Sequence, residues 1–142
     1  MNRKSLLTLA MAGTMVLMAG ATALAQDRML VSIPFDFNVG SASLPAGDYE
    51  VSPLLANAAL VRNASTRDAV VTITTAASTA ETSEPAALVF HQYGNSYFLS
   101  EIRMPESRKK LYTSRLERQV AAQEQENAAN KSGDRNVVIA AR

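Results

Sequence analysis

The strongest signal for the fold lies in residues 88–102, which read LVFHQY, then GN, then SYFLSEI. Two aromatic-rich runs flank Gly94-Asn95, a pattern that predicts an antiparallel hairpin with a tight type II′ turn. Large apolar side chains fall on both faces of this hairpin. We therefore expect it to lie centrally in the fold, covered on both sides. A two-residue and a three-residue loop give different facing pairs, and the sequence leaves the register open.

The β pattern extends backwards from this hairpin. Between residues 29 and 104, short apolar alternations are separated by Gly, Pro, Asn and Asp at intervals of roughly ten residues, as in a β-sandwich or β-barrel. Phe35, Phe37 and Val39 share one face at a period of two. Pro34 lacks an N–H, so the first strand should lie at an edge or carry a bulge there.

Three further segments complete the β region. Residues 44–48 (LPAGD) are typical of a turn and precede a strand that contains Tyr49 and Val51. Residues 58–62 and 69–75 form a second predicted hairpin around residues 63–68. Residues 76–85 have no apolar period, and this predicts an exposed, mobile loop.

The composition changes after Met104. Pro105-Glu106 suits the first turn of a helix, because Pro loses no hydrogen bond there and an acid meets the positive end of the dipole. Tyr112, Leu116 and Val120 recur at four-residue spacing and predict a narrow apolar stripe. We therefore expect an amphipathic helix over about 106–124. A polar linker over about 125–135 and a final β-branched strand over about 136–141 should follow.

The N-terminus has the features of an export signal. Arg3 and Lys4 precede an uncharged apolar run over residues 6–18, and Ala23-Leu24-Ala25 presents small residues at positions −3 and −1 of a cleavage site. An uncleaved membrane anchor is the alternative, but the second half of the segment is Ala, Gly and Thr, too weakly apolar to span a bilayer. We predict a signal peptide over residues 1–25 and one domain over 26–142. Such a signal predicts a bacterial periplasmic or secreted protein. No cysteine follows the apolar run, so a lipoprotein is not expected.

The composition excludes several classes of protein. The chain has 142 residues, 14 basic and 13 acidic side chains, one histidine and no cysteine. Disulfides, Cys-ligated zinc, iron–sulfur clusters and thiol catalysis are therefore excluded. Arg3 and Lys4 are the only charges in the first 25 residues, so the remainder has 12 basic and 13 acidic side chains and a net charge of −1. A surface dedicated to nucleic acid is not expected.

Two motifs resemble a known family. Residues 33–40 (IPFDFNVG) are followed by residues 44–51 (LPAGDYEV), and related patterns continue in 88–94, 97–101 and 137–142. Together they resemble a family of small exported bacterial proteins of unknown function. The resemblance covers most of the predicted domain. It supports the domain boundaries and the β fold, and it implies no activity, ligand or catalytic residue.

The catalytic motifs that can be drawn are incomplete. His91 has no partner at H-x-H or H-E-x-x-H spacing, so we expect a strand residue with a hydrogen-bonded ring and no metal site. A Ser–His–acid triad could use Ser96 or Ser100 with Glu101, but a G-x-S-x-G elbow is absent. The carboxylates that could pair for glycoside hydrolysis are Asp36, Asp48, Glu50 and Glu101. The aromatic residues that could stack on a sugar, or simply fill cross-strand positions, are Tyr93, Tyr97 and Phe98. We predict no catalytic, metal or cofactor site.

A basic cluster is the best candidate for a binding surface. The cluster comprises Arg103, Arg108, Lys109, Lys110, Arg115 and Arg118. These six lie within sixteen positions together with Glu106 and Glu117, a local net charge of +4. On a helix, Arg108, Arg115 and Arg118 could share a face and bind an anionic envelope polymer or a membrane surface. The simpler interpretation is the solvated face of an amphipathic helix. Aromatic residues for stacking on nucleic acid are missing apart from Tyr112.

Together these patterns predict a mainly β protein, a sandwich of about seven antiparallel strands with one amphipathic helix before the final strand. The function expected is that of an exported, non-catalytic envelope module that acts by binding or assembly, without a cofactor. The candidate binding residues are Arg108, Lys109, Lys110, Arg115 and Arg118. The alternative is a hydrolase of an envelope glycan or ester that uses Glu101 or His91. Self-association through edge strands is a third possibility.

Overall fold

The computed structural model describes residues 28–78, 85–105, 107–128 and 135–141, which form ten strands and one helix. The elements are β1 (Met29–Ile33), β2 (Phe37–Val39), β3 (Ala42–Leu44), β4 (Gly47–Leu55), β5 (Ala58–Asn63), β6 (Ala69–Ser78), β7 (Ala87–Tyr93), β8 (Ser96–Met104), β9 (Ser107–Leu111), α1 (Arg115–Ala128) and β10 (Arg135–Ala140). The mainly β prediction is confirmed. The number of strands in the described residues, ten, exceeds the expected seven because β2 is separate from β1 and because β3 and β9 were not expected. The predicted signal peptide lies outside the described residues.

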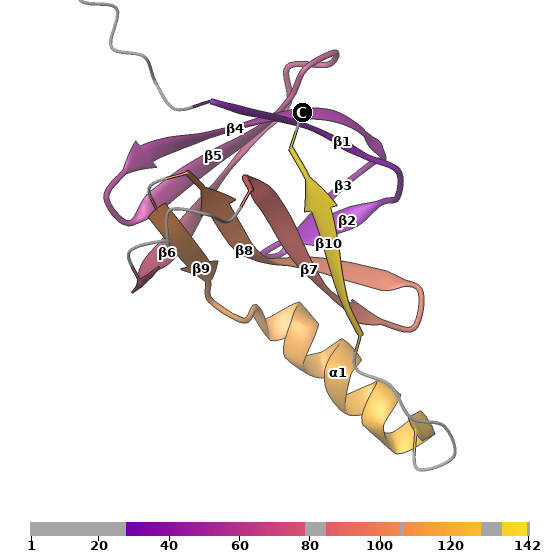
Figure 1. Ribbon diagram of the computed structural model, residues 1–142. Coiled ribbons are helices and arrows are strands. Elements are labelled where there is room, and N and C mark those ends of the chain that lie inside the picture. The colour runs from indigo at the N-terminus through magenta and orange to yellow at the C-terminus, as the bar shows by residue number, and fades with distance from the viewer. Residues whose placement is uncertain (1–27, 79–84, 106, 129–134, 142) are drawn as a thin grey trace, which may run out of the picture.

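The sheet folds into two layers that share β6 (Figure 1). In the upper layer β1, β4 and β5 pair antiparallel, and β5 pairs with residues 69–73 of β6. From residue 74 onwards β6 pairs with β9 in the lower layer, which continues through β8 and β7 to β10. β2 joins the same edge of β8 that β9 occupies, and this one pairing is parallel. β1 and β10 contact each other on the side opposite β6, so the two layers enclose a core.

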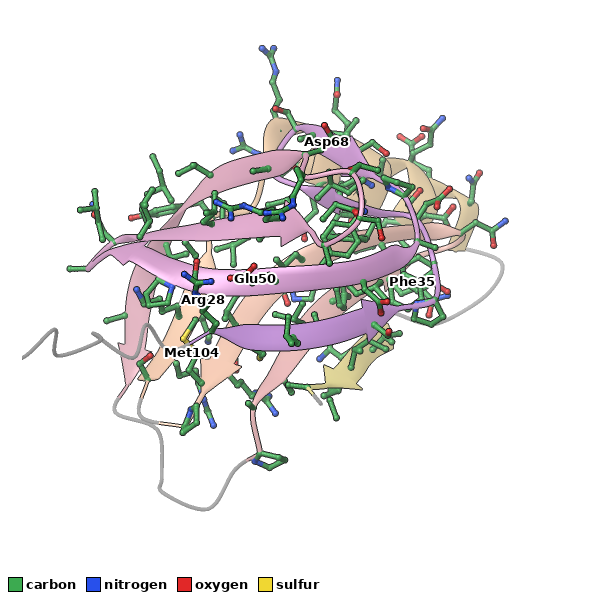
Figure 2. All side chains as sticks on the ribbon, turned by 90° about the horizontal axis from the view of Figure 1, so that it is seen from above. Arg28, Phe35, Glu50, Asp68 and Met104 are labelled. Atoms are coloured by element: carbon green, nitrogen blue, oxygen red, sulfur yellow. The ribbon has the colours of Figure 1, made fainter. Side chains whose placement is uncertain are left out.

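Aromatic rings fill the centre of this core. Phe90 on β7 is completely buried and meets Phe35 and Phe37 edge to face, with ring centroids 5.3 and 5.4 Å apart. Phe37 also meets Tyr49 from the upper layer at 5.0 Å. Phe35 stacks on Tyr97 at one end of the molecule, far from Met104, which is buried at the other end (Figure 2). The core is therefore continuous between the layers, because Phe37 contacts both Tyr49 of the upper layer and Phe90 of the lower layer.

The central hairpin is confirmed, and the structure selects its register. Tyr93 faces Ser96 across a two-residue loop, and Gly94 has a φ of 57°, as at the first central position of a type II′ turn. β7 lies between β8 and β10, and β8 lies between β7 and the edge formed by β9 and β2. The expected central position is thus correct. Pro34 follows β1, which lies at an edge of the sheet, as predicted.

The predicted helix over 106–124 is wrong in its first half. Residues 107–111 form β9, in which Arg108 and Lys110 alternate with Lys109 at the strand period of two. α1 begins only at Arg115, after Ser114, whose Oγ accepts a hydrogen bond from the N–H of Glu117 at 3.0 Å. Ser114 is therefore the N-cap, and the S-x-x-E spacing is the helix-start signature that the sequence analysis overlooked.

The apolar stripe predicted for this helix is also wrong. Tyr112 precedes α1 and is 65% exposed, and Leu116 is 39% exposed. The face nearest the sheet instead contains the buried Glu117, with Val120 one turn further along the helix. Two turns beyond Glu117, the carboxylate of Glu124 lies beside Gly94 in the hairpin loop. The helix therefore packs through polar contacts, which a search for apolar periodicity does not detect.

Three further segments have boundaries that differ from the prediction. The helix continues to Ala128 and so includes the beginning of the predicted linker, whereas residues 129–134 lie outside the described residues. The predicted loop over 76–85 begins as the end of β6, and its residues 79–84 also lie outside the described residues. The final strand covers 135–140 in place of the predicted 136–141.

Candidate binding site

A β-bulge places two polar residues on the outer face of the lower layer. Val89 pairs with Glu101 and Phe90 pairs with Leu99, so Ser100 is the extra residue on β8. Neighbouring residues of a regular strand point to opposite faces, but a bulge interrupts this alternation. Ser100 and Glu101 consequently line the same cavity on the side facing α1, and the hydroxyl of Ser100 donates to the carbonyl of Val89 at 3.0 Å.

Basic side chains surround Glu101. The Nε of Arg103 donates to its carboxylate at 2.7 Å, and the Nε of Arg108 lies 3.5 Å from the same oxygen. Arg108 faces Arg103 across the β8–β9 pair, and Lys110 faces Glu101. We call Arg103, Arg108 and Lys110 the cationic row. It sets three positive charges against one carboxylate that is 12% exposed.

Glu117 anchors α1 to the sheet. This side chain is among the buried residues, at 4% exposure, although it is charged. Its Oε1 lies 2.8 Å from Nδ1 of His91 and 3.5 Å from the hydroxyl of Tyr93, both on β7. The carboxylate also lies in the first turn of α1, where the helix dipole favours negative charge. The expectation that the ring of His91 is hydrogen-bonded is confirmed, and its partner is a helix residue that was expected on a solvated face.

A cavity of about 350 Å³ separates α1 from this outer face. Its lining residues are Val89, His91, Ser100, Glu101, Arg103, Lys110, Leu111, Thr113, Glu117 and Asn136. Val89, Glu101 and Glu117 are buried and form the floor, whereas Lys110, Thr113 and Asn136 are exposed at the rim. The helix lies below the lower layer in Figure 1, along the β7–β8 hairpin, and contributes Glu117 to the lining of the cavity.

Three residues named as possible catalytic groups, His91, Ser100 and Glu101, line this cavity, whereas Ser96 does not. Their contacts do not form a triad. The Ser100 hydroxyl donates to a backbone carbonyl, and Nδ1 of His91 contacts Glu117. Among the described contacts, none joins Ser100 to His91. In this geometry His91 therefore does not act on the Ser100 hydroxyl, and the two side chains have separate partners in one polar cavity.

The candidate basic residues divide into three groups. Arg108 and Lys110 lie on the outer face of β9, and Arg115 and Arg118 are exposed on α1. Lys109 is buried, at 9% exposure, and its Nζ donates to the carbonyl oxygens of Leu55 at 3.1 Å and Ala56 at 3.3 Å. Lys109 thus joins β9 to the β4–β5 turn of the other layer. This position does not favour Lys109 as a binding residue, because its ammonium group is already held by two carbonyl oxygens.

The other predicted carboxylates lie away from the cavity. Asp36 accepts a hydrogen bond from the N–H of Ala46 at 2.8 Å, and Asp48 accepts one from Ser32. Glu50 forms an ion pair with Arg28 at 3.0 Å on the upper layer, as Figure 2 shows. In the described part of the chain, no three His, Asp or Glu side chains come together as a metal site.

Two of the aromatic side chains considered for sugar stacking contribute to packing. Phe98 is 2% exposed, and Tyr97 stacks on Phe35 with ring centroids 4.0 Å apart. The burial of Phe98 and the stacking of Tyr97 both agree with the simpler interpretation that the aromatic side chains of the hairpin contribute to packing.

No protein-family model, curated protein or solved structure matches this chain. The resemblance to small exported proteins therefore stays a prediction. Within the described residues, no helix is both long and apolar enough to cross a bilayer.

Proposed function

We propose that this protein is an exported, non-catalytic module of the bacterial cell envelope that binds an anionic envelope polymer or membrane surface. The observation that carries the proposal is the cationic row. Arg103 and Arg108 face each other across β8 and β9, and such like-charged pairs destabilise a sheet. Glu101 lies between these two cations, and Lys110, which faces Glu101 on β9, adds an exposed positive charge that an anionic partner would neutralise.

Two further exposed cations lie on α1. Arg115 and Arg118 are exposed on the first turns of α1, three positions apart, and so lie on the same side of the helix. Charged groups at a surface attract over a Debye length, which is about 10 Å at 0.1 M salt. Binding through these residues should therefore be strong at low salt and weak at high salt.

Reversing two of these charges should remove the protein from the envelope. We expect Lys110→Glu with Arg115→Glu to lower the fraction that co-sediments with isolated envelopes at low salt by about tenfold or more, since each cation near an anionic surface contributes about 1 kcal/mol. The matched control is Arg62→Glu with Arg67→Glu, which reverses two basic residues of β5 and the β5–β6 turn. Vesicles of anionic lipid, used alone, separate membrane binding from polymer binding.

Two results would contradict the proposal. One is binding that is unchanged at high salt, because the attraction would then not be electrostatic. The other is equal binding by the charge-reversal variant and its control. Either result would remove the cationic row as the binding surface.

Export is tested separately, by the N-terminus of the exported protein. We expect the mature chain to begin at Gln26, because Ala23 and Ala25 place small side chains at positions −3 and −1. Ala25→Phe should therefore accumulate uncleaved precursor, whereas Leu24→Phe at position −2 should be processed normally. Intact-mass measurement of each variant checks this. A mature wild-type protein that begins elsewhere would contradict the assigned site.

A hydrolase is the second candidate, and one observation favours it: His91, Ser100, Glu101 and Glu117 line the same cavity. An enzyme that used this cavity should hydrolyse an ester or glycan and lose turnover in the His91→Ala, Glu101→Ala double variant. The separate partners of Ser100 and His91 favour binding without catalysis.

A further inference from the structure

We infer that the cavity between α1 and the lower layer is a binding site for a carboxylate-bearing sugar, such as one unit of an acidic polysaccharide. This inference rests on the proposed binding function and names the ligand class that the surface would recognise. The cavity, of about 350 Å³, lies at the lower end of the range of small-molecule sites, about 300–1,000 Å³. It therefore has room for a compact ligand between the helix and the sheet.

The anionic group of the ligand is inferred from which charges are already engaged. The carboxylate of Glu101 accepts from Arg103, and that of Glu117 contacts His91. The ammonium group of Lys110, at the rim, has no hydrogen bond or ion pair with the residues that the structure describes. Both carboxylates therefore already have basic or polar partners, whereas the Lys110 ammonium group has none among the described residues. An anion needs only to approach Lys110.

The sugar is inferred from the neutral lining. The hydroxyl of Thr113, the amide of Asn136 and Nε2 of His91 likewise have no hydrogen bond to the described residues, and each lines the cavity. Val89 and Leu111 are its apolar members, which is too little apolar surface for an acyl chain. Uncommitted hydroxyl, amide and imidazole groups match a ligand with several hydroxyls, each of which can both donate and accept.

The first test is an NMR titration of the exported protein with glucuronate, glucose and acetate as separate probes. We expect glucuronate to shift the backbone amides of Ser100, Thr113 and Asn136 in a saturable manner. Glucose lacks the carboxylate and acetate lacks the ring, so each should bind at least about tenfold more weakly. Equal affinity for acetate and glucuronate would overturn the sugar assignment, and the absence of shifts with glucuronate would overturn the site.

Variants at the rim give a second readout. Lys110→Gln removes the cation and Asn136→Leu fills the rim with an apolar group, and both positions are exposed, so the fold should tolerate them. Each should weaken glucuronate binding by about tenfold or more, whereas Arg62→Gln on β5 should leave it unchanged. Unaltered binding by both rim variants would overturn the inference.

The inference and the proposed function can fail separately. If glucuronate does not bind while envelope co-sedimentation remains salt-sensitive, the sugar site is overturned and the binding function stands. If glucuronate binds at the cavity but the protein does not co-sediment with envelopes, the envelope function is overturned and the site stands.

Discussion

Replacing Phe90 with alanine should lower the free energy of unfolding by about 3–5 kcal/mol. Phe90 is completely buried, and its ring contacts both Phe35 and Phe37 at the centre of the core. Its removal loses the transfer free energy of the ring and leaves a cavity that neighbouring strands cannot close. Since a typical domain is stable by about 5–15 kcal/mol, this variant should be close to unfolding.

Urea denaturation followed by far-UV circular dichroism measures this loss. Val71→Ala on β6 is the control, because Val71 is 57% exposed and its truncation should change stability by less than about 1 kcal/mol. A loss below about 1 kcal/mol for Phe90→Ala would contradict the packing described here.

Replacing Lys109 with methionine should lower the free energy of unfolding by about 2–3 kcal/mol. Methionine keeps most of the volume of the side chain but cannot donate to the carbonyl oxygens of Leu55 and Ala56, which Nζ of Lys109 contacts at 3.1 and 3.3 Å. The link between β9 and the β4–β5 turn is then lost. Chemical denaturation at neutral pH measures the change.

Lys110→Met is the matched control for this prediction. Lys110 is the next residue along β9 but is exposed, so its replacement should change stability by no more than about 0.5 kcal/mol. If the two substitutions lowered the free energy of unfolding by similar amounts, the buried position of Lys109 and the exposed position of Lys110 would be contradicted. The two substitutions should have the opposite ranking in envelope binding. Lys110→Met should weaken binding, whereas folded Lys109→Met protein should bind as the wild type does.

The elements that could be predicted from the sequence depend on short-range patterns. Two apolar runs around Gly94-Asn95 define the hairpin, and the position of Pro34 after β1 indicates an edge, because each pattern restricts the backbone locally. The β9 strand could not be found in this way. Its charged residues have no apolar alternation, and it is extended because it pairs with β8 and β6, which lie elsewhere in the chain.

The candidate site, too, combines residues that the sequence singles out with an arrangement that only strand pairing produces. His91, Ser100 and Glu101 were each considered from the sequence, but as members of a catalytic motif and not of one binding cavity. The bulge that turns Ser100 and Glu101 to one face depends on strand register, which no local pattern states. Glu117 was read as part of a solvated helix face, and Asn136 reaches the cavity only because β10 pairs with β7.

Local sequence patterns are therefore enough to predict a mainly β protein built around the 88–102 hairpin, and they also predict the export signal. The packing of the two layers, in contrast, sets which charged side chains are buried and which are exposed. Lys109 and Lys110 are identical neighbours in the sequence, yet one ammonium group is held by two carbonyls of the opposite layer and the other lies at the rim of a cavity. The physical reason is that a strand directs successive side chains to opposite faces, and only the assembled layers determine which face meets solvent.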